Sequence, residues 1–206
     1  NSVISAVDEA TATDAQKEYL GMAYCYRAMI NLDMGRMYEF KKNTYTSAPE
    51  LEGVTIPIIR ENMTESEARN NARVSKEALI EYILGDLAKA IDFFSDEEGK
   101  SSFKRMNKTQ PDLSVAYGLQ ARAYLWAEEY EKARTAAENA LAAGNYSALT
   151  EAQATDPTTG FNSASSNNSW MWCSSLVKED YVVKSSLLNF ISWMSSETVF
   201  GYAPAG

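Results

Sequence analysis

Apolar residues recur at steps of three and four along several stretches of the chain, which is the spacing of one face of an α-helix. From about Thr13 to Tyr38, this spacing is followed by Tyr19, Leu20, Ala23, Tyr26, Met29, Ile30, Met34 and Met37. Ser75 is suited to cap a second helix, whose apolar stripe comprises Ile80, Ile83, Leu84, Leu87, Ile91 and Phe94. The pattern predicts two long helices, and the second must pack on neighbours to be stable.

The stretch between these helices contains residues that interrupt regular structure. Residues 41–53 are polar and include the breakers Pro49 and Gly53. The apolar patch 54–59 follows, and because Pro57 lacks an amide donor, we expect an extended crossing segment and not a central strand. Thr64 opens a sequence with capping-box spacing, which predicts a short helical turn.

Two further helices are predicted in the middle of the chain. Pro111 and Asp112 open one that runs to about Leu125, and a turn leads into Tyr130–Ala143, which Gly144 ends. Bulky, small and aromatic residues alternate here as in a tetratricopeptide hairpin, at Tyr117, Ala121, Tyr124, Tyr130, Ala133, Ala137, Ala140 and Leu141. The predicted fold class is therefore all-α, with tetratricopeptide-like helical hairpins and long irregular loops.

Composition and charge narrow the possible functions. The 206 residues carry a net charge of −9, which repels a nucleic-acid backbone, so nucleic acid is not an expected partner. No apolar run approaches the roughly 20 residues that span a bilayer. From Ser147 to Leu176 the chain is rich in Ser, Thr, Asn and Ala and almost free of charge, which predicts a long irregular loop.

The residue types for several kinds of catalysis are missing. The chain has no histidine and no glycine-rich nucleotide loop, so we expect no imidazole catalysis, no metal site and no cofactor. Cys25 and Cys173 lie far apart and are interpreted as free thiols. A glycosidase would need two facing carboxylates, and the candidates are the groups at 96–98, 128–129 and 179–180. The first two are interpreted as solvated surface. No catalytic residues are predicted.

Aromatic residues are numerous, with four tryptophans and twelve tyrosines, and an aromatic face can stack on a sugar ring. Those on helical stripes are interpreted as core or inter-helix residues: Tyr19, Tyr26, Tyr82, Tyr117, Tyr124, Trp126 and Tyr130. Those in or beside polar loops are the candidate glycan-binding residues, with structural anchoring as the alternative: Tyr45, Trp170, Trp172, Trp193 and Tyr202.

Ordered sequence blocks across residues 15–150 resemble the SusD/RagB family. They comprise the first helix (17–28) with its Gly35 turn, the apolar-proline patch 56–59, residues 73–75, 82–90 and 116–130, and the closing 142–146. The resemblance implies one SusD-like helical domain over 1–206, part of a longer chain. Its scaffold would be 15–146 and its loop-rich ligand side 147–206.

The resemblance also implies a function. Family members bind oligosaccharides or polysaccharides without cleaving them and deliver them to a SusC-like TonB-dependent transporter. They are exposed on the cell outer membrane and attached by a lipid anchor at an N-terminal Cys, which is absent from this chain. The alternative hypotheses are a tetratricopeptide-type adaptor that binds a protein or peptide in its helical groove, and a glycosidase.

Overall fold

Most of the structure, a computed structural model that describes residues 1–45, 48–96, 98–156 and 168–173, is carried by long helices. These are α2 (Asp14–Tyr38), α4 (Lys76–Phe94), α5 (Leu113–Trp126) and α6 (Tyr130–Ala143). Shorter elements are α1 (Ser2–Ala6), α3 (Glu65–Arg69), α7 (Glu151–Thr155) and a 3-10 turn at Pro49–Leu51. The chain divides into residues 1–172 and 173–206, and the description below concerns the first unit.

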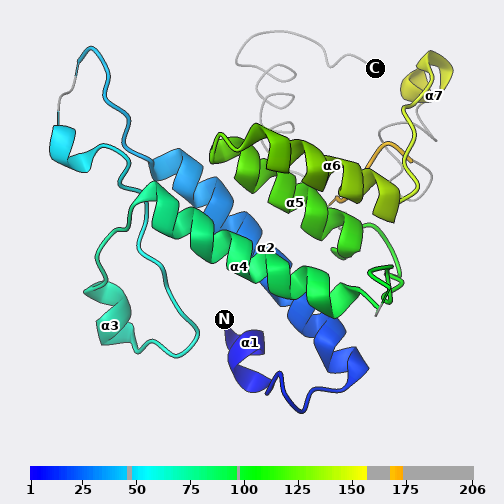
Figure 1. Ribbon diagram of the computed structural model, residues 1–206, viewed down its shortest axis with the longest axis horizontal. Helices are drawn as coiled ribbons and strands as arrows, with labels where there is room; N and C mark the ends of the chain where they lie inside the picture. The colour runs from blue at the N-terminus through cyan, green and yellow to red at the C-terminus, as the bar shows by residue number, and fades with distance from the viewer. Residues whose placement is uncertain (46–47, 97, 157–167, 174–206) are drawn as a thin grey trace, which may run out of the picture. The chain divides into compact units, whose positions relative to one another are not determined.

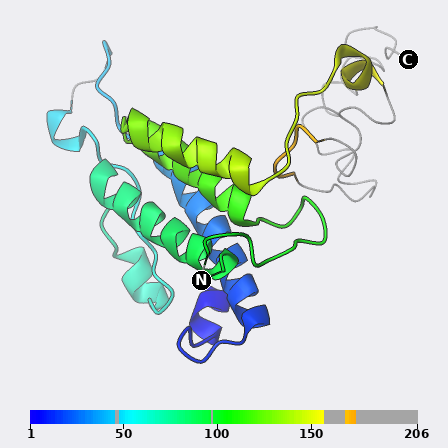
Figure 2. The same ribbon diagram turned by 45° about the vertical axis from the view of Figure 1, so that its right-hand side comes forward.

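The long helices form two antiparallel hairpins. α2 packs along α4, α5 packs along α6, and α5 also contacts both α4 and α2 (Figure 1). Turned by 45°, the α5–α6 pair is seen beside the pair formed by α2 and α4 (Figure 2). Ala133, Ala136 and Ala140 of α6 are buried, which lets α6 approach α5 closely. The predicted all-α fold of tetratricopeptide-like hairpins is confirmed.

Capping side chains begin the helices, and those at Thr64, Ser75 and Asp112 were predicted. Thr13 and Gln16 form a reciprocal capping box at α2, and Thr64 forms another with Glu67 at α3. Ser75 and Asp112 cap α4 and α5 through their side chains. α7 was not expected, because the stretch after residue 146 has an irregular composition. It too begins with a capping box, formed by Thr150 and Gln153.

The face of α2 that enters the core differs from the predicted stripe. Leu20, Tyr24, Cys25, Ala28 and Leu32 are buried, whereas Ile30, Met34 and Met37 are exposed. Tyr19 of α2 and Tyr130 of α6 are each 62% exposed, so their interpretation as core residues is wrong. For α2, the predicted stripe was wrong because two faces of the helix carry apolar residues. Helical spacing alone does not say which of the two faces is covered.

Two glycines mark the side of α2 that meets the other helices. A Cβ on Gly21 would lie 2.7 Å from Phe94, and one on Gly35 would lie 2.6 Å from Leu79 and 2.8 Å from Trp126. Only glycine lets these side chains come so close to the α2 backbone. The pair therefore identifies the core-facing side more clearly than the apolar stripe does.

Residues 54–59 form the predicted extended crossing segment. Val54 and Ser75 make an isolated antiparallel bridge, the amide of Thr55 donates to the carbonyl of Val74 at 2.8 Å, and Val74 donates to Ile56 at 3.2 Å. Thr55 and Ile56 are buried. Among the described residues, no helix is both long and apolar enough to cross a membrane.

Candidate functional site

A groove runs along the side of α2 that faces away from the core. Its volume is about 890 Å³, and α2, the crossing segment and the N-terminus line it. The apolar residues that form its walls are Tyr26, Ile30, Met34, Tyr38, Pro57 and Ile59. These side chains meet because residues 54–59 are held by Val74 beside the C-terminal half of α2. We call this feature the α2 groove.

Arg27 lies at the floor of the α2 groove and is held by carboxylates. Its guanidinium donates to both carboxylate oxygens of Asp86, at 2.8 and 2.7 Å, and to Glu61 at 2.8 Å. The guanidinium carbon lies 5.2 Å and 5.1 Å from the ring centroids of Tyr24 and Tyr82. This cation is therefore fully engaged inside the protein.

Burial and charge shift the pKa values of this cluster in different directions. Burial raises the pKa of Asp86, and the ion pair with Arg27 only partly opposes that shift. Burial acts to lower the pKa of Arg27, but Asp86 raises it above its ordinary value, so Arg27 stays charged. Burial, reinforced by the Asp86 charge, raises the pKa of Tyr82 to about 12. Arg27 and Tyr82 therefore stay protonated at neutral pH, and the ion pair between Arg27 and Asp86 suits a structural role.

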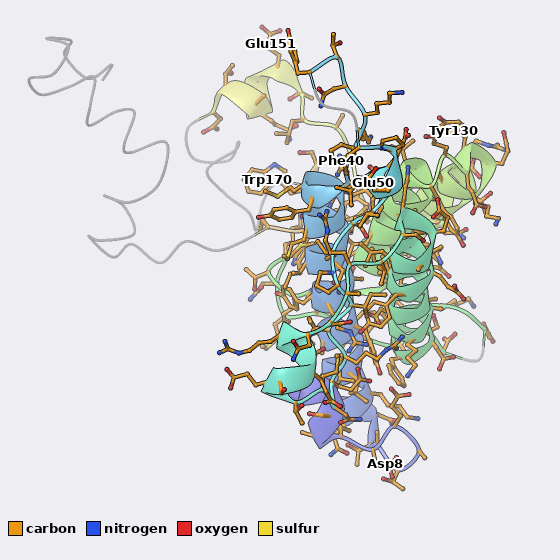
Figure 3. The ribbon with its side chains drawn as sticks, turned by 90° about the vertical axis from the view of Figure 1, so that its left-hand side faces the viewer. Asp8, Phe40, Glu50, Tyr130, Glu151 and Trp170 are labelled. Atoms are coloured by element: carbon orange, nitrogen blue, oxygen red, sulfur yellow. The ribbon has the colours of Figure 1, made fainter. Side chains whose placement is uncertain are left out.

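Arg73, at the other end of the α2 groove, binds backbone carbonyls. Its guanidinium donates to the carbonyl of Tyr38 at 2.7 Å and to the carbonyl of Thr55. The contact ties the C-terminal end of α2 to the crossing segment. Figure 3 shows Phe40 and Glu50 at this end of α2, where the chain leaves the helix.

Trp172 is partly buried on the outward side of α2. Its ring lies 5.2 Å from that of Tyr26, and its indole N–H donates to the carbonyl of Thr109 at 3.0 Å. The hydroxyl of Tyr26 donates to the same carbonyl at 3.1 Å. The residue before Trp172 is also held, because the backbone carbonyl of Met171 accepts a hydrogen bond from Arg105 at 2.8 Å. Trp172 thus anchors its segment to the helices, and its ring is only partly available to a ligand.

Of the other candidate aromatics, the structure describes Tyr45 and Trp170. Tyr45 follows α2 in the loop and is 95% exposed. Trp170 is partly buried and lies two residues before Trp172 in the chain. Trp193 and Tyr202 lie outside the described residues. Their role in glycan binding stays a prediction.

The carboxylate pairs serve local structure where they are described. Asp96 accepts the backbone N–H groups of Glu98 at 2.9 Å and Lys100 at 2.8 Å, so it closes a turn. Glu129 pairs with Lys132 on the surface of α6. Within the described ranges, no three His, Cys, Asp or Glu residues are grouped to hold a metal ion. Residues 97 and 179–180 lie outside those ranges.

Sequence reasoning missed the α2 groove, although the signal was present. α2 presents apolar residues on a second face, including Tyr26, Ile30 and Met34, besides the face that enters the core. The outward positions Ile30 and Met34 were counted with the core stripe, which hid the second face. Pro57 and Ile59 reach the groove through a chain reversal that spacing cannot reveal.

The comparisons with known proteins identify the same fold elsewhere. No family model matches the sequence, and no curated protein matches it. A SusD-like carbohydrate binding protein from Bacteroides vulgatus ATCC 8482 matches with a TM-score of 0.60 and 27% identity, over 78% of this chain and 31% of that chain. A SusD superfamily protein from Bacteroides thetaiotaomicron VPI-5482 matches with a TM-score of 0.54 and 17% identity, over 72% and 30%.

The fold and groove define an all-α protein of paired helices, in which the described residues leave one apolar face of α2 open. More particularly, the chain is SusD-like over the part that it shares with the Bacteroides vulgatus structure, as its sequence blocks indicated. The Bacteroides thetaiotaomicron match supports the fold alone, because the identity is low. The chain spans less than a third of either solved chain.

Proposed function

We propose that this protein binds an oligosaccharide or polysaccharide at the bacterial cell surface without cleaving it, and delivers it to a SusC-like TonB-dependent transporter. In the longer protein, a lipid anchor would hold it on the outer membrane. The observation that carries the proposal is the match to the SusD-like carbohydrate binding protein of Bacteroides vulgatus at 27% identity. The exposed ring of Tyr45 and the partly exposed rings of Trp170 and Trp172 supply aromatic faces on which sugar rings stack.

The positions of Tyr45 and Trp172 bear on the size of the ligand. Trp172 lies against Tyr26, and Tyr45 lies beyond the end of α2 at Tyr38. The helix between these two points is roughly 18 Å long, at about 1.5 Å per residue. A ligand that contacts both aromatics must therefore be an oligosaccharide and not a single sugar.

Calorimetry with a broad panel of oligosaccharides tests the proposal. We expect binding in the millimolar-to-micromolar range, and Tyr45→Ala or Trp170→Ala should weaken it about tenfold, or ~1.4 kcal/mol. Tyr19→Ala is the matched control, because Tyr19 is also an exposed tyrosine, on the helix. The proposal would be abandoned if no glycan gave heat, or if Tyr45, Trp170, Trp193 and Tyr202 could all be changed without effect.

A reducing-end assay tests the non-catalytic part. Incubating the protein with every glycan that binds should release no new reducing ends, because a glycosidase requires two carboxylates placed across the scissile bond. Release of reducing ends that tracks the purified protein would contradict the proposal and favour a glycosidase.

A further inference from the structure

The segment 168–172, drawn in orange in Figure 2, carries two of the candidate tryptophans and is held at both of its ends. At the first end, the backbone carbonyl of Asn168 accepts from the amide of Ser147 at 3.2 Å. At the other end, the indole N–H of Trp172 donates to the carbonyl of Thr109 at 3.0 Å. The segment is therefore fastened to the chain that follows α6 and to the chain that precedes α5.

Arg105 holds the middle of this segment. Its guanidinium donates to the carbonyl of Met171 at 2.8 Å and pairs with the carboxylate of Asp112 at 2.9 Å. It also donates to the carbonyl of Gln110 at 3.2 Å and to the hydroxyl of Tyr146 at 3.3 Å. The side chain is only 13% exposed. Because the guanidinium is a rigid planar fork, the bonds that hold one of its edges fix the direction of the others.

The partners of Arg105 are themselves fixed by the first turn of α5. The carboxylate of Asp112 accepts from the amide of Val115 at 3.1 Å and from the hydroxyl of Ser114 at 2.7 Å. Ser114 is fully buried and also hydrogen-bonds the hydroxyl of Tyr146. The donor that reaches the segment 168–172 is thus set by a helix and not by another loop.

α5 also leaves room for a side chain of the segment. A Cβ on Gly118 would lie 2.9 Å from the sulfur of Met171, and Met171 packs against the hydrophobic core. Both the backbone and the side chain of Met171 are therefore held. Its two neighbours in the chain are Trp170 and Trp172, so the contacts of Met171 limit where these two rings can lie.

We propose that Arg105 is a positioning residue of the glycan site, which fixes Trp170 and Trp172 before a ligand arrives. The inference rests on the proposed function and adds that this part of the site is preformed. A preformed site binds more tightly, because side chains and loops need not be ordered during binding. The guanidinium is paired with protein groups, so Arg105 acts through the two tryptophans and not through contact with the sugar.

Arg105→Gln combined with Asp112→Asn tests the proposal. The double change leaves no uncompensated charge, and asparagine caps a helix as well as aspartate does. We expect the affinity for oligosaccharides, measured by calorimetry, to fall about tenfold as the preformed arrangement is lost. The matched control is Arg122→Gln combined with Asp33→Asn, which removes a surface ion pair between α5 and α2. The control should bind as the unaltered protein does.

Arg105→Lys is a second variant that keeps the positive charge beside Asp112. A single ammonium group lacks the planar fork that reaches Asp112 and the carbonyl of Met171 together. We expect a smaller loss of affinity than in the double variant. Circular dichroism checks that each variant keeps its helices, and Arg105→Lys decides the question if the double variant does not fold.

Fluorine NMR of protein labelled with fluorotryptophan gives a readout that does not depend on a ligand. The four tryptophan resonances are assigned by single Trp→Phe substitutions. In the double variant and in Arg105→Lys, the resonances of Trp170 and Trp172 should shift or broaden. The resonance of Trp126 should stay unchanged, because Trp126 ends α5 and its indole is held by Glu39 at 3.0 Å.

The outcomes separate this inference from the proposed function. Weaker binding together with changes at Trp170 and Trp172 alone supports it. Unchanged affinity despite those spectral changes would make Arg105 a structural residue only, and weaker binding without them would mean that Arg105 contacts the sugar; either result overturns the inference but not the proposed function. An equal change at Trp126 in Arg105→Lys would show general loosening and also overturn it. If no glycan gave heat with the unaltered protein, the proposed function would fall, and this inference with it.

Discussion

Arg27 joins several parts of the protein through one side chain. It connects α2 to Asp86 of α4 and to Glu61 of the segment between them, and it lies between Tyr24 and Tyr82. Asp86 is 4% exposed, so its charge depends on this partner. Removing one member of a buried pair leaves the other charge uncompensated, which is more harmful than removing both.

Arg27→Met should therefore lower the free energy of unfolding by about 3–5 kcal/mol. Arg27→Met combined with Asp86→Leu should recover much of that loss, because the buried charge is removed together with its partner. Urea unfolding followed by circular dichroism measures both. If the double variant were as unstable as the sum of the single variants, the ion pair would not be coupled in this way.

At the scale of the elements, the glycines of α2 decide how closely the helices approach. Gly35→Ala should destabilise the fold by about 1–3 kcal/mol, because the new methyl group would overlap Leu79 and Trp126. Gly85→Ala in α4 is the matched control. It has no neighbouring atom within 4 Å of the added carbon and should stabilise the helix by about 0.5–1 kcal/mol. Thermal unfolding distinguishes the opposite signs.

The helices and their starts could be predicted from sequence, because caps and spacing are local. Thr64 and Ser75 cap the helices as predicted, and the first long helix begins beside Thr13, where its spacing placed the start. The choice of face could not be predicted for α2, because both faces are apolar and only contacts with α4 and α5 distinguish them. The α2 groove was missed for the same reason.

Part of the candidate site could be predicted. The sequence indicated Trp172 as a candidate glycan-binding residue, but not its contacts with Tyr26 and Thr109, which are distant along the chain.

For the whole molecule, carboxylates whose pKa values are lowered by their partners predict a loss of stability in acid. Lys89 and Tyr24 lower the pKa of Glu9. Burial acts to raise the pKa of Glu39, but Trp126, Lys76 and Lys41 together hold it below the ordinary value. An acid whose pKa is lower in the folded state stabilises the fold above its unfolded pKa, and loses that contribution as the pH falls through the folded pKa.

The urea midpoint should accordingly fall as the pH drops below about 4.3, the ordinary pKa of glutamate. Glu39→Gln should make this decline shallower, because glutamine has no proton to take up. Glu98→Gln is the control, since Glu98 lies on an exposed turn. An unchanged slope for Glu39→Gln would show that Glu39 does not contribute to the acid sensitivity.

The two hairpins differ in the length of chain between their helices, and this difference affects the order of folding. Residues 127–129 join α5 to α6, whereas residues 39–75 separate α2 from α4. Closing the longer loop costs more entropy before any contact forms. The α5–α6 hairpin should therefore form first in the folding transition state. Ala136→Gly in α6 should mainly slow refolding, and Ala28→Gly in α2 should mainly speed unfolding, in stopped-flow measurements.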